Sequence, residues 1–428
     1  MAVNFARTAW LRIHLYLALG GGFLFVLLGL SGSLSVYREE LDELLNPRLT
    51  VDEPKGGYLP LDRIMAAVRE AHPDRYGAWV LEMPRSRNGM ITVWYEKPYE
   101  TFGEFYAPLM VSVNPYTAEI VASRFWGRTA ATWIYDLHTQ LHFGRFRWNA
   151  VGILGLLLVA SASTGLYLWW PGFSRLRRSF VIRHDAGLAR LAFDLHRTLG
   201  LFSAVVLLLL AFTGFHLAYP SLLETMLGAS EMGHGDEGPE IISTGAPNGR
   251  PVGLAEAVLV ARGLFPHAEV RRVATPAGEN GTYRINLRRS GDANIRHPAT
   301  LVWVDRWSGQ IREVRNPNKF SSGQAFISRI WPWHTGEAFG ATGRFVWFCV
   351  GLMPLVLYVT GLLHWLHRRG SIADREIDLS TLRPKLELAW SAFLRQSADL
   401  LRFVRILAGW ALVRLMRLAQ WGKRRYLD

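Results

Sequence analysis

Seven of the 13 histidines in this 428-residue chain lie at or near the ends of long apolar stretches. Three lie toward one end of the stretches and four toward the other: His14, His196 and His364, and then His138, His142, His216 and His334. In the stretch 193–220, His196 and His216 are 20 residues apart, which is roughly 30 Å along a helix. An apolar segment of membrane length with an ionisable group near each end is a functional-site hypothesis. This spacing predicts chemistry at both faces of a membrane.

Three kinds of chemistry commonly use histidine inside a membrane: proton relay, metal binding and axial ligation of haem. A proton relay usually includes intramembrane Asp or Glu, and the apolar cores of these stretches contain none. A zinc or copper site favours short histidine spacings with added carboxylates or thiolates. Only His138 and His142 have such a spacing, and no soft ligand is near them in the sequence. Haem ligation is therefore the chemistry that these residues favour.

A bis-histidine haem takes one imidazole from each of two helices and needs small residues that leave room for the macrocycle. Small residues recur in the apolar stretches at Gly20, Gly21, Gly22, Gly32, Gly165, Gly214 and Gly361. We therefore expect two haems, one near each face, which together form an electron path across the membrane. The alternative for any single histidine is an interfacial, hydrogen-bonded side chain.

Two pairs of histidines occur in matching contexts in the two halves of the chain. His14 matches His196, and His138 matches His334, so we expect each pair to provide haem ligands. The other three candidates, His216, His364 and His142, have no counterpart, because Leu34, Leu168 and Ala338 stand at the matching positions. Each of these three can still replace a symmetric ligand. His72, His184, His267 and His297 are interpreted as surface residues.

Four apolar stretches are long enough to cross the ~30 Å core of a bilayer as helices. They cover 10–37, 148–170, 193–220 and 345–366. The first also resembles a signal peptide, but its internal copy, in which Thr213-Gly214 matches Ser31-Gly32, predicts that it is retained.

The single cysteine, Cys349, excludes an intrachain disulfide, a cysteine-ligated iron–sulfur cluster and covalent CxxCH haem attachment.

The spans and the segments between them form a repeated unit. LHTQLHFG (137–144) precedes the second span, and WHTGEAFG (333–340) precedes the fourth. The predicted boundaries are 1–37 (span), 38–137 (outside domain), 138–170 (span), 171–192 (loop), 193–220 (span), 221–333 (outside domain), 334–369 (span) and 370–428 (tail). The predicted fold is an α-helical membrane protein, a four-helix transmembrane bundle built from a duplicated span–domain–span unit with two small α+β domains.

Hydrophobic periodicity places elements inside both outside segments. The first has a helical pattern at 59–71, strand-like runs at 79–83, 90–95 and 109–113, and a hairpin at 111–123. The second has a helical pattern at 253–263, a strand-like run at 283–287 and a hairpin at 301–314. The acidic loop 231–238 contains His234, which is interpreted as a solvated residue rather than a metal ligand.

Positive charge predicts the orientation of the spans. Residues 1–12, 171–197 and 367–428 together carry the whole net charge of +13, and basic residues near spans stay on the cytoplasmic side. Both termini are therefore expected in the cytoplasm. Because the basic residues flank the predicted membrane spans, they are not interpreted as a nucleic-acid-binding surface. The stretch 386–420 has a basic amphipathic pattern that predicts an interfacial helix against membrane lipid, with a docking helix for a protein partner as the alternative.

The ordered motifs of residues 7–370 resemble those of the PepSY-associated transmembrane proteins of bacterial inner membranes. The resemblance is carried by the hairpins 111–120 and 302–311, by LHTQLHFG and WHTGEAFG, by Arg12-Ile-His14 and Leu195-His196-Arg197, and by GLYLWWPG (165–172). It implies that the two outside segments are PepSY-type periplasmic domains. It also implies iron-regulated proteins, including ferric-siderophore reductases that carry b-type haems on histidines at these positions.

The resulting functional hypothesis is a haem-dependent oxidoreductase that reduces a ferric siderophore in the periplasm. Reduction to Fe(II) weakens binding by hard oxygen donors and so releases iron. No GxGxxG motif is present, so the electrons are expected from a membrane quinol or a separate cytoplasmic reductase. The alternative is a non-enzymatic membrane protein whose PepSY-type domains bind or regulate a periplasmic partner. The identity of the siderophore and the oligomeric state do not follow from these residues.

Overall fold

The computed structural model describes residues 2–52, 54, 56–143, 146–172, 177–183, 187–230, 232, 238–244 and 249–372. The chain divides into two compact units, one of Met1–Val181 with Leu195–Leu363 and one of Ile182–Asp194 with His364–Asp428. The predicted amphipathic helix at 386–420 and the loop residue His234 lie outside the described residues.

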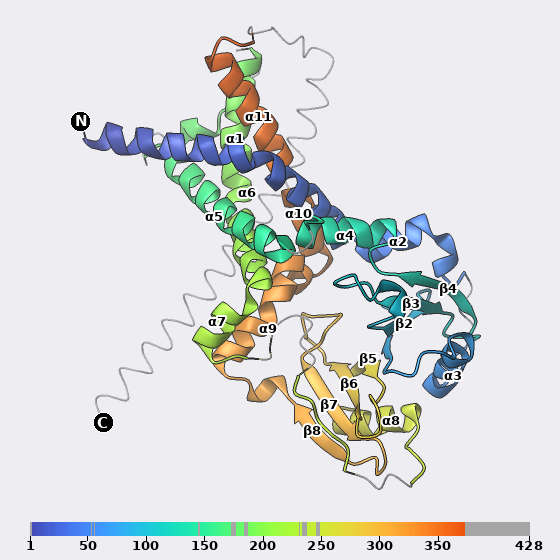
Figure 1. The fold of residues 1–428 in the computed structure, drawn as a ribbon. Helices are drawn as coiled ribbons and strands as arrows, with labels where there is room; N and C mark the ends of the chain where they lie inside the picture. Colours follow the sequence, from blue (N-terminus) through green and yellow to red (C-terminus); the bar gives the residue numbers. More distant parts are fainter. Residues whose placement is uncertain are drawn as a thin grey trace, which may run out of the picture. The chain divides into compact units, whose positions relative to one another are not determined.

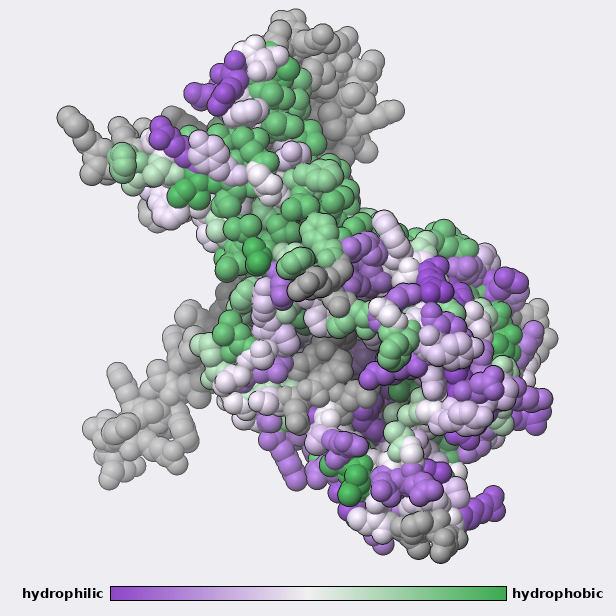
Figure 2. Space-filling view, in the orientation of Figure 1, coloured by the Kyte–Doolittle hydropathy of each residue, from purple (hydrophilic) through white to green (hydrophobic). Residues whose placement is uncertain are grey.

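Among the described residues, four helical segments are long and apolar enough to cross a membrane, which confirms the prediction of four candidate spans. They are Phe5–Val36, Trp148–Trp169, Leu188–Ala218 and Glu337–Arg368. The helices concerned are α1 (Ala2–Val36), α5 (Arg147–Trp169), α6 (Leu188–Ala218), and α10 (Gly340–Gly351) with α11 (Met353–Arg368). On the face shown in Figure 2, hydrophobic residues gather over these helices and hydrophilic ones over the sheet described below.

The fourth span is interrupted between α10 and α11 where α1 crosses it. Pro354 lies in the first turn of α11, and a proline there cannot donate the hydrogen bond that would continue α10. The Ser33 hydroxyl of α1 donates to the Phe348 carbonyl at 2.8 Å. A Cβ on Gly29 would overlap the Gly351 carbonyl. Small residues therefore bring the two helix backbones into direct contact at the break.

The eight strands in the described part of the chain form one antiparallel sheet in the order β4-β3-β2-β1-β5-β6-β7-β8. The strands are β1 (Val80–Glu82), β2 (Ile91–Tyr95), β3 (Leu109–Val113), β4 (Ile120–Phe125), β5 (Glu269–Ala274), β6 (Thr282–Arg288), β7 (Thr300–Asp305) and β8 (Ile311–Arg315). The three-residue β1 joins the halves, because it pairs with β2 and also with β5, where Leu81 faces Val273. The strands of the two outside segments therefore share one sheet (Figure 1).

One hydrophobic core lies between the sheet and two helices, α3 (Leu61–Ala71) and α8 (Leu254–Leu264). Its fully buried members include Ile64, Val93, Val111, Ala257 and Ile285. Burial of these side chains supplies most of the sheet domain's stabilisation, at roughly 25 cal/mol per Å² of apolar surface. Val80, Trp94 and Met110 belong to a separate cluster with Trp126, as expected from the two-residue period of strands.

Shorter helices connect the spans to the sheet. They are α2 (Arg38–Leu45), α4 (Ala130–Gln140), α7 (Pro220–Leu227) and α9 (Ser322–Thr335), with 3₁₀ turns at Pro47–Leu49, Tyr99–Thr101, Arg177–Phe180, Pro317–Lys319 and Glu337–Phe339. Reciprocal capping boxes begin α4 and α9, at Thr129 with Thr132 and at Ser321 with Gln324. Left-handed residues follow both helices, Leu141 after α4 and Gly336 after α9. These signals set the length of the two helices that carry His138 and His334.

Candidate functional site

His14 and His196, which we call the far pair, lie side by side within the spans. His14 is on α1 and His196 on α6, and their ring centroids are 6.3 Å apart with the ring planes at 82°. Nδ1 of His14 lies 3.0 Å from the Ser161 carbonyl oxygen of α5. Nδ1 of His196 lies 2.9 Å from the Leu357 carbonyl oxygen of α11. All four spans therefore contribute to the surroundings of this pair.

His138 and His334, which we call the sheet-side pair, lie on the helices that lead from the sheet to the spans. His138 is on α4 and His334 on α9, with ring centroids 6.0 Å apart and ring planes at 35°. Nδ1 of His138 lies 2.9 Å from the Leu28 carbonyl oxygen of α1. Nδ1 of His334 lies 2.8 Å from the Thr213 hydroxyl of α6. Neither ring relies on its own helix for its hydrogen bond.

All four rings lie over a glycine that directly follows a serine or threonine. For the far pair, a Cβ on Gly165 would lie 3.2 Å from Cε1 of His14, and a Cβ on Gly361 would lie 3.1 Å from Cε1 of His196. For the sheet-side pair, a Cβ on Gly32 would lie 2.7 Å from Cε1 of His138, and a Cβ on Gly214 would lie 3.3 Å from Cε1 of His334. The carbonyls that contact Nδ1 of the first three rings, those of Ser161, Leu357 and Leu28, belong to the residue four positions before the glycine. We call each such arrangement a histidine socket.

The sockets determine which nitrogen of each neutral ring carries the proton. A backbone carbonyl can only accept, so Nδ1 of His14, His196 and His138 must be the donor. The Thr213 hydroxyl donates to the Leu209 carbonyl at 2.6 Å, so its oxygen accepts from Nδ1 of His334. The lone pair of each neutral ring is then on Nε2, which is the arrangement that orients a histidine for metal binding.

The separation within each pair fits an iron atom held by two imidazoles. With metal–nitrogen distances of roughly 2 Å, the two ring centroids are about 6 Å apart, and the pairs have 6.3 and 6.0 Å. Each pair supplies two ligands, the number that remains for protein on a haem iron. Within the described ranges, no group of three or more His, Cys, Asp or Glu side chains is placed to hold a metal ion. The donor set fits haem.

The other three candidate histidines have different surroundings. His142 stacks on Trp133 at 4.8 Å between centroids, with Nε2 3.2 Å from the Trp133 carbonyl oxygen. His364 belongs to the second compact unit, where its ring is 5.0 Å from that of Phe193. His216 is only 2% exposed and lines a cavity beside α9. The structure thus brings together the two pairs with matching sequence contexts, and iron binding by any of the seven histidines stays a prediction.

A cluster of charged side chains lies near the sheet-side pair and has no signal in the sequence. Arg85, which follows β1, is 2.8 Å from Glu39 of α2 and 3.3 Å from Glu337 just after α9. Arg296 is 3.1 Å from Glu82 of β1, and burial raises the pKa of the Glu82 carboxyl although Arg272 opposes this. These residues are distant in the sequence, so only the fold shows that they meet. They tie the centre of the sheet to helix ends beside the spans.

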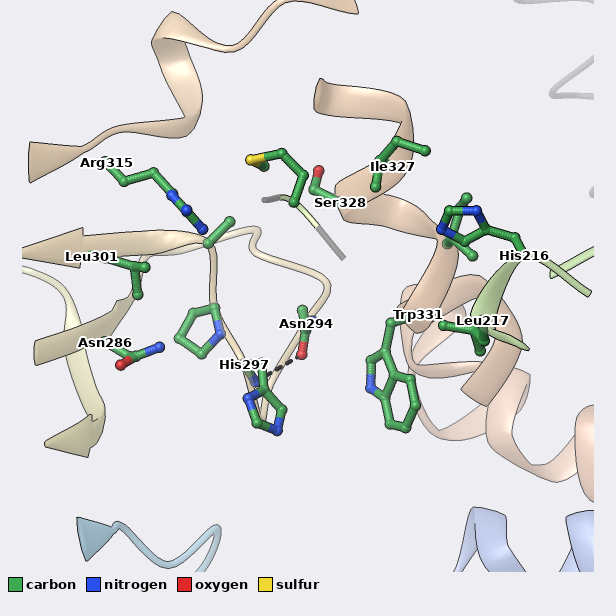
Figure 3. A pocket seen from close by; sticks show the side chains of 14 residues that line it. His216, Leu217, Asn286, Asn294, His297, Leu301, Arg315, Ile327, Ser328 and Trp331 are labelled. Carbon is green, nitrogen blue, oxygen red and sulfur yellow. Dashed lines mark hydrogen bonds between the residues drawn. The ribbon is translucent and has the colours of Figure 1, made fainter. Parts of the chain in front are cut away.

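The structure gives a further position for His297, which the sequence placed among the surface residues. In the structure it is half-buried and lines the same cavity as His216 (Figure 3). Nothing in the local sequence marks it, because it lies in an irregular segment between β6 and β7.

A comparison with protein-family models shows which family the chain matches. The model described as "PepSY-associated TM region" matches residues 11–368, a stretch that includes all four socketed histidines and every strand of the sheet. No curated protein matches the chain at a significant level.

Proposed function

The chain belongs to the PepSY-associated TM family, and we propose that its far pair and its sheet-side pair each hold one haem b. The protein would then carry electrons across a bacterial inner membrane and reduce a ferric siderophore in the periplasm. The observation that carries this proposal is the recurrence of one socket at four histidines, with ring separations of 6.3 and 6.0 Å. Bound there, a haem supplies a reversible one-electron Fe(III)/Fe(II) couple.

The protein's own contribution is to hold and orient the ligands. The Nδ1 hydrogen bonds keep the four imidazoles neutral in the required tautomer and increase their basicity as ligands. The sockets also keep each ring from rotating, because the glycine below it leaves space for the ring alone. The apolar spans around the far pair exclude water, which favours electron transfer through the protein over side reactions with solvent.

The proposed direction of electron flow follows from the charge distribution. The basic segments 1–12 and 171–197 favour cytoplasmic termini, so the sheet and the sheet-side pair are assigned to the periplasm. In this arrangement the two halves of the sheet are PepSY-type domains, and each span–domain–span half is one copy of a duplicated unit. The same order of one helix and four strands in both halves, α3 with β1–β4 and α8 with β5–β8, supports this assignment.

The proposed reaction is a one-electron transfer to an Fe(III) chelate. A quinol or a cytoplasmic reductase would supply the electron, haems held by the far and sheet-side pairs would supply the one-electron couple that carries it, and the chelated Fe(III) would be reduced to Fe(II). Because Fe(II) binds hard oxygen donors less tightly, the chelator then releases it. The chain's part in this step is to keep the sheet-side pair at the membrane surface next to the sheet, where a periplasmic chelate can approach.

A reduced-minus-oxidised visible spectrum of the detergent-purified full chain, with haem quantified per chain, tests this function. We expect b-type α and Soret bands, about two haems per chain, and re-oxidation by an added ferric chelate. His14→Ala and His334→Ala should each remove one haem, whereas the control His142→Ala should retain both. A featureless spectrum after expression with ample haem would contradict the proposal and favour a non-enzymatic protein that binds a periplasmic partner.

A further inference from the structure

The connection between β2 and β3 exposes a group of aromatic side chains at its tip, residues 99–106. They are Tyr99, Phe102, Phe105 and Tyr106, and Phe102 is 87% exposed. Single apolar side chains on a surface are ordinary, but a group of them marks a site of interaction. The corresponding connection of the other half, residues 289–299, contains no Phe, Tyr or Trp. The aromatic tip is therefore a feature of the first half of the sheet.

The tip is a closed turn of the sheet domain. Thr101 is buried, and its hydroxyl donates to the Ala107 carbonyl at 2.7 Å. The Glu104 backbone N–H donates to the Thr101 carbonyl at 2.9 Å. At the base, the Tyr106 ring meets the ring of the buried Trp126 edge-on, with centroids 5.5 Å apart. These contacts hold the turn in place, so the exposed rings are presented by an ordered segment.

The tip lies against the start of the second span. The rings of Phe105 and Trp148 meet edge to face, with centroids 5.1 Å apart and ring planes at 89°. Trp148 begins the apolar segment Trp148–Trp169, whose 22 residues extend about 33 Å as a helix. This is close to the ~30 Å thickness of the hydrocarbon core, so the two tryptophans are placed at the two membrane–water interfaces, where tryptophan is enriched. A ring that touches Trp148 is at the same level.

Exposed aromatic rings also lie on the chain that leads into this span. Phe143 and Phe146 are 52% and 65% exposed, and both are within five residues of Trp148. Aromatic side chains of this kind anchor the end of a span in the headgroup region. The tip of the β2–β3 connection thus adds rings from the sheet domain to the aromatic residues at this end of α5.

The charges of the tip are compatible with contact with lipid. Its two charged residues are Glu100 and Glu104. Glu100 is paired with Arg75, and Glu104 is paired with Arg128 at 2.7 Å. A carboxylate paired with a guanidinium brings no net charge to the membrane surface, so partial desolvation costs less than it would for a free carboxylate.

We propose that the tip of the β2–β3 connection inserts its aromatic rings into the headgroup region of the bilayer, beside the start of the second span. The partner of this surface is lipid, because the contact between Phe105 and Trp148 continues the apolar surface of a span onto the loop. The inserted rings hold the first half of the sheet at the membrane. This interaction needs no haem, so it stands or fails independently of the proposed function.

Photocrosslinking of the full-length protein in phospholipid vesicles tests this surface. The photoreactive amino acid p-benzoylphenylalanine replaces Phe102 and, as the control, Thr117. Thr117 is exposed in the β3–β4 turn, at the other end of the five-residue β3, or about 17 Å away along the strand. Burying one phenylalanine ring favours the buried state by roughly tenfold or more, so we expect roughly tenfold more lipid adduct at residue 102 than at residue 117. Mass spectrometry of the irradiated protein measures both.

Two results of this experiment would overturn the proposal. A crosslinked dimer in place of the lipid adduct at residue 102 would assign the surface to a second copy of the chain. Equally low yields of lipid adduct at residues 102 and 117 would show that the tip is in water.

Hydrogen exchange in the same vesicles gives a second test without an unnatural residue. Because the Phe102 ring is exposed, Phe102→Ser removes little packing within the protein and acts mainly through lipid. We expect the amides of residues 102–106 to exchange about tenfold faster in this variant than in wild type. The control Tyr58→Ser, at an exposed aromatic residue that contacts Tyr116 of the β3–β4 turn, should leave these amides unchanged. Exchange in Phe102→Ser at the wild-type rate would contradict insertion.

Discussion

Gly32 lies directly under the imidazole ring of His138, and a Cβ there would be 2.7 Å from Cε1 and 2.9 Å from Nδ1 of that ring. Both distances are shorter than normal van der Waals contact, so any side chain at this position must displace the ring or the helix that carries it. The ring also loses its 2.9 Å hydrogen bond to the Leu28 carbonyl if it moves. This contact makes the glycine part of the site.

Replacing Gly32 with alanine should therefore disturb one haem and spare the other. We expect Gly32→Ala to lower haem content from about two to about one per chain, as measured by pyridine haemochrome and visible spectra. Gly20→Ala is the matched control on the same helix, because a Cβ at Gly20 meets nothing within 4 Å. Equal haem content in the two variants would show that the socket is not needed for binding.

The Thr213 hydroxyl should tune the sheet-side haem. It accepts from Nδ1 of His334 at 2.8 Å, and removal of such a supporting hydrogen bond typically costs 10–100-fold in metal affinity. Thr213→Val keeps the side-chain shape and removes the hydroxyl acceptor, although the Leu210 carbonyl remains. We therefore expect weaker haem binding at this site and a raised midpoint potential, because a less basic imidazole stabilises Fe(III) less. Redox titration of each haem measures this. Thr213→Ser should behave as wild type, and a similar change in both variants would contradict the argument.

Arg271 should be important for the junction between β1 and β5. It is 6% exposed, and it donates to the carbonyls of Met83 and Pro84, both at 2.9 Å. Arg271→Met leaves two partly buried carbonyls without these donors, so we expect a loss of about 2–4 kcal/mol in the free energy of unfolding. Thermal unfolding in detergent measures it. The control Arg312→Met, at an exposed site on β8, should change the unfolding midpoint little. If it shifts the midpoint as much as Arg271→Met does, the hydrogen bonds of Arg271 are not specifically important for the junction between β1 and β5.

Asp305 should make the β7–β8 turn sensitive to acid. Burial raises the pKa of its carboxyl, but hydrogen bonds from the backbone N–H groups of Ser308, Thr244 and Trp307 outweigh burial and lower the pKa below its ordinary value. A carboxyl with a lowered pKa in the folded state stabilises it above the unfolded pKa of about 3.9. That stabilisation is lost as the pH falls through the folded-state value.

Asp305→Asn should therefore weaken the turn at pH 7, and its effect should diminish as the pH falls through the folded-state pKa. We expect about tenfold lower hydrogen-exchange protection at the Ser308 and Trp307 amides at pH 7, with the difference from wild type shrinking below pH 4. Asparagine preserves the turn geometry, since Asn114 accepts a backbone hydrogen bond at the corresponding turn of the other half. If the difference in protection between Asp305→Asn and wild type is constant from pH 3 to 7, the shape of the side chain at this position, rather than its charge, causes the effect.

Local patterns predicted many elements of the fold. The strand-like run at 109–113 is β3 (Leu109–Val113), and the helical run at 59–71 contains α3 (Leu61–Ala71). β5 was not predicted, because its sequence EVRRVA has arginines where an apolar alternation is expected, and one of them, Arg271, is buried by its bonds to carbonyls. The β1–β5 pairing could not be predicted either, since it joins residues almost two hundred positions apart.

The candidate site, like the fold, could be predicted only in part from the sequence. Matching sequence contexts were enough to pair His14 with His196 and His138 with His334, and the structure places each pair in contact. The carbonyl groups that fix Nδ1 could not be predicted, because every residue has one and only the packing selects Ser161, Leu357 and Leu28. The place of His297 beside a cavity could not be predicted for a related reason, since that cavity is lined by distant strands and helices.

The pairing of β1 with β5 has a consequence for biogenesis. Between Val80 and its partner Ala274, the ribosome makes almost two hundred residues, including the spans Trp148–Trp169 and Leu188–Ala218. At ~5–20 residues per second, this takes roughly 10–40 s. During that time the inner edge of β1 has no strand beside it, and such an open edge can pair with other chains. Completion of the sheet therefore follows synthesis of the third span, and the first half of the sheet depends on protection by its surroundings until β5 arrives.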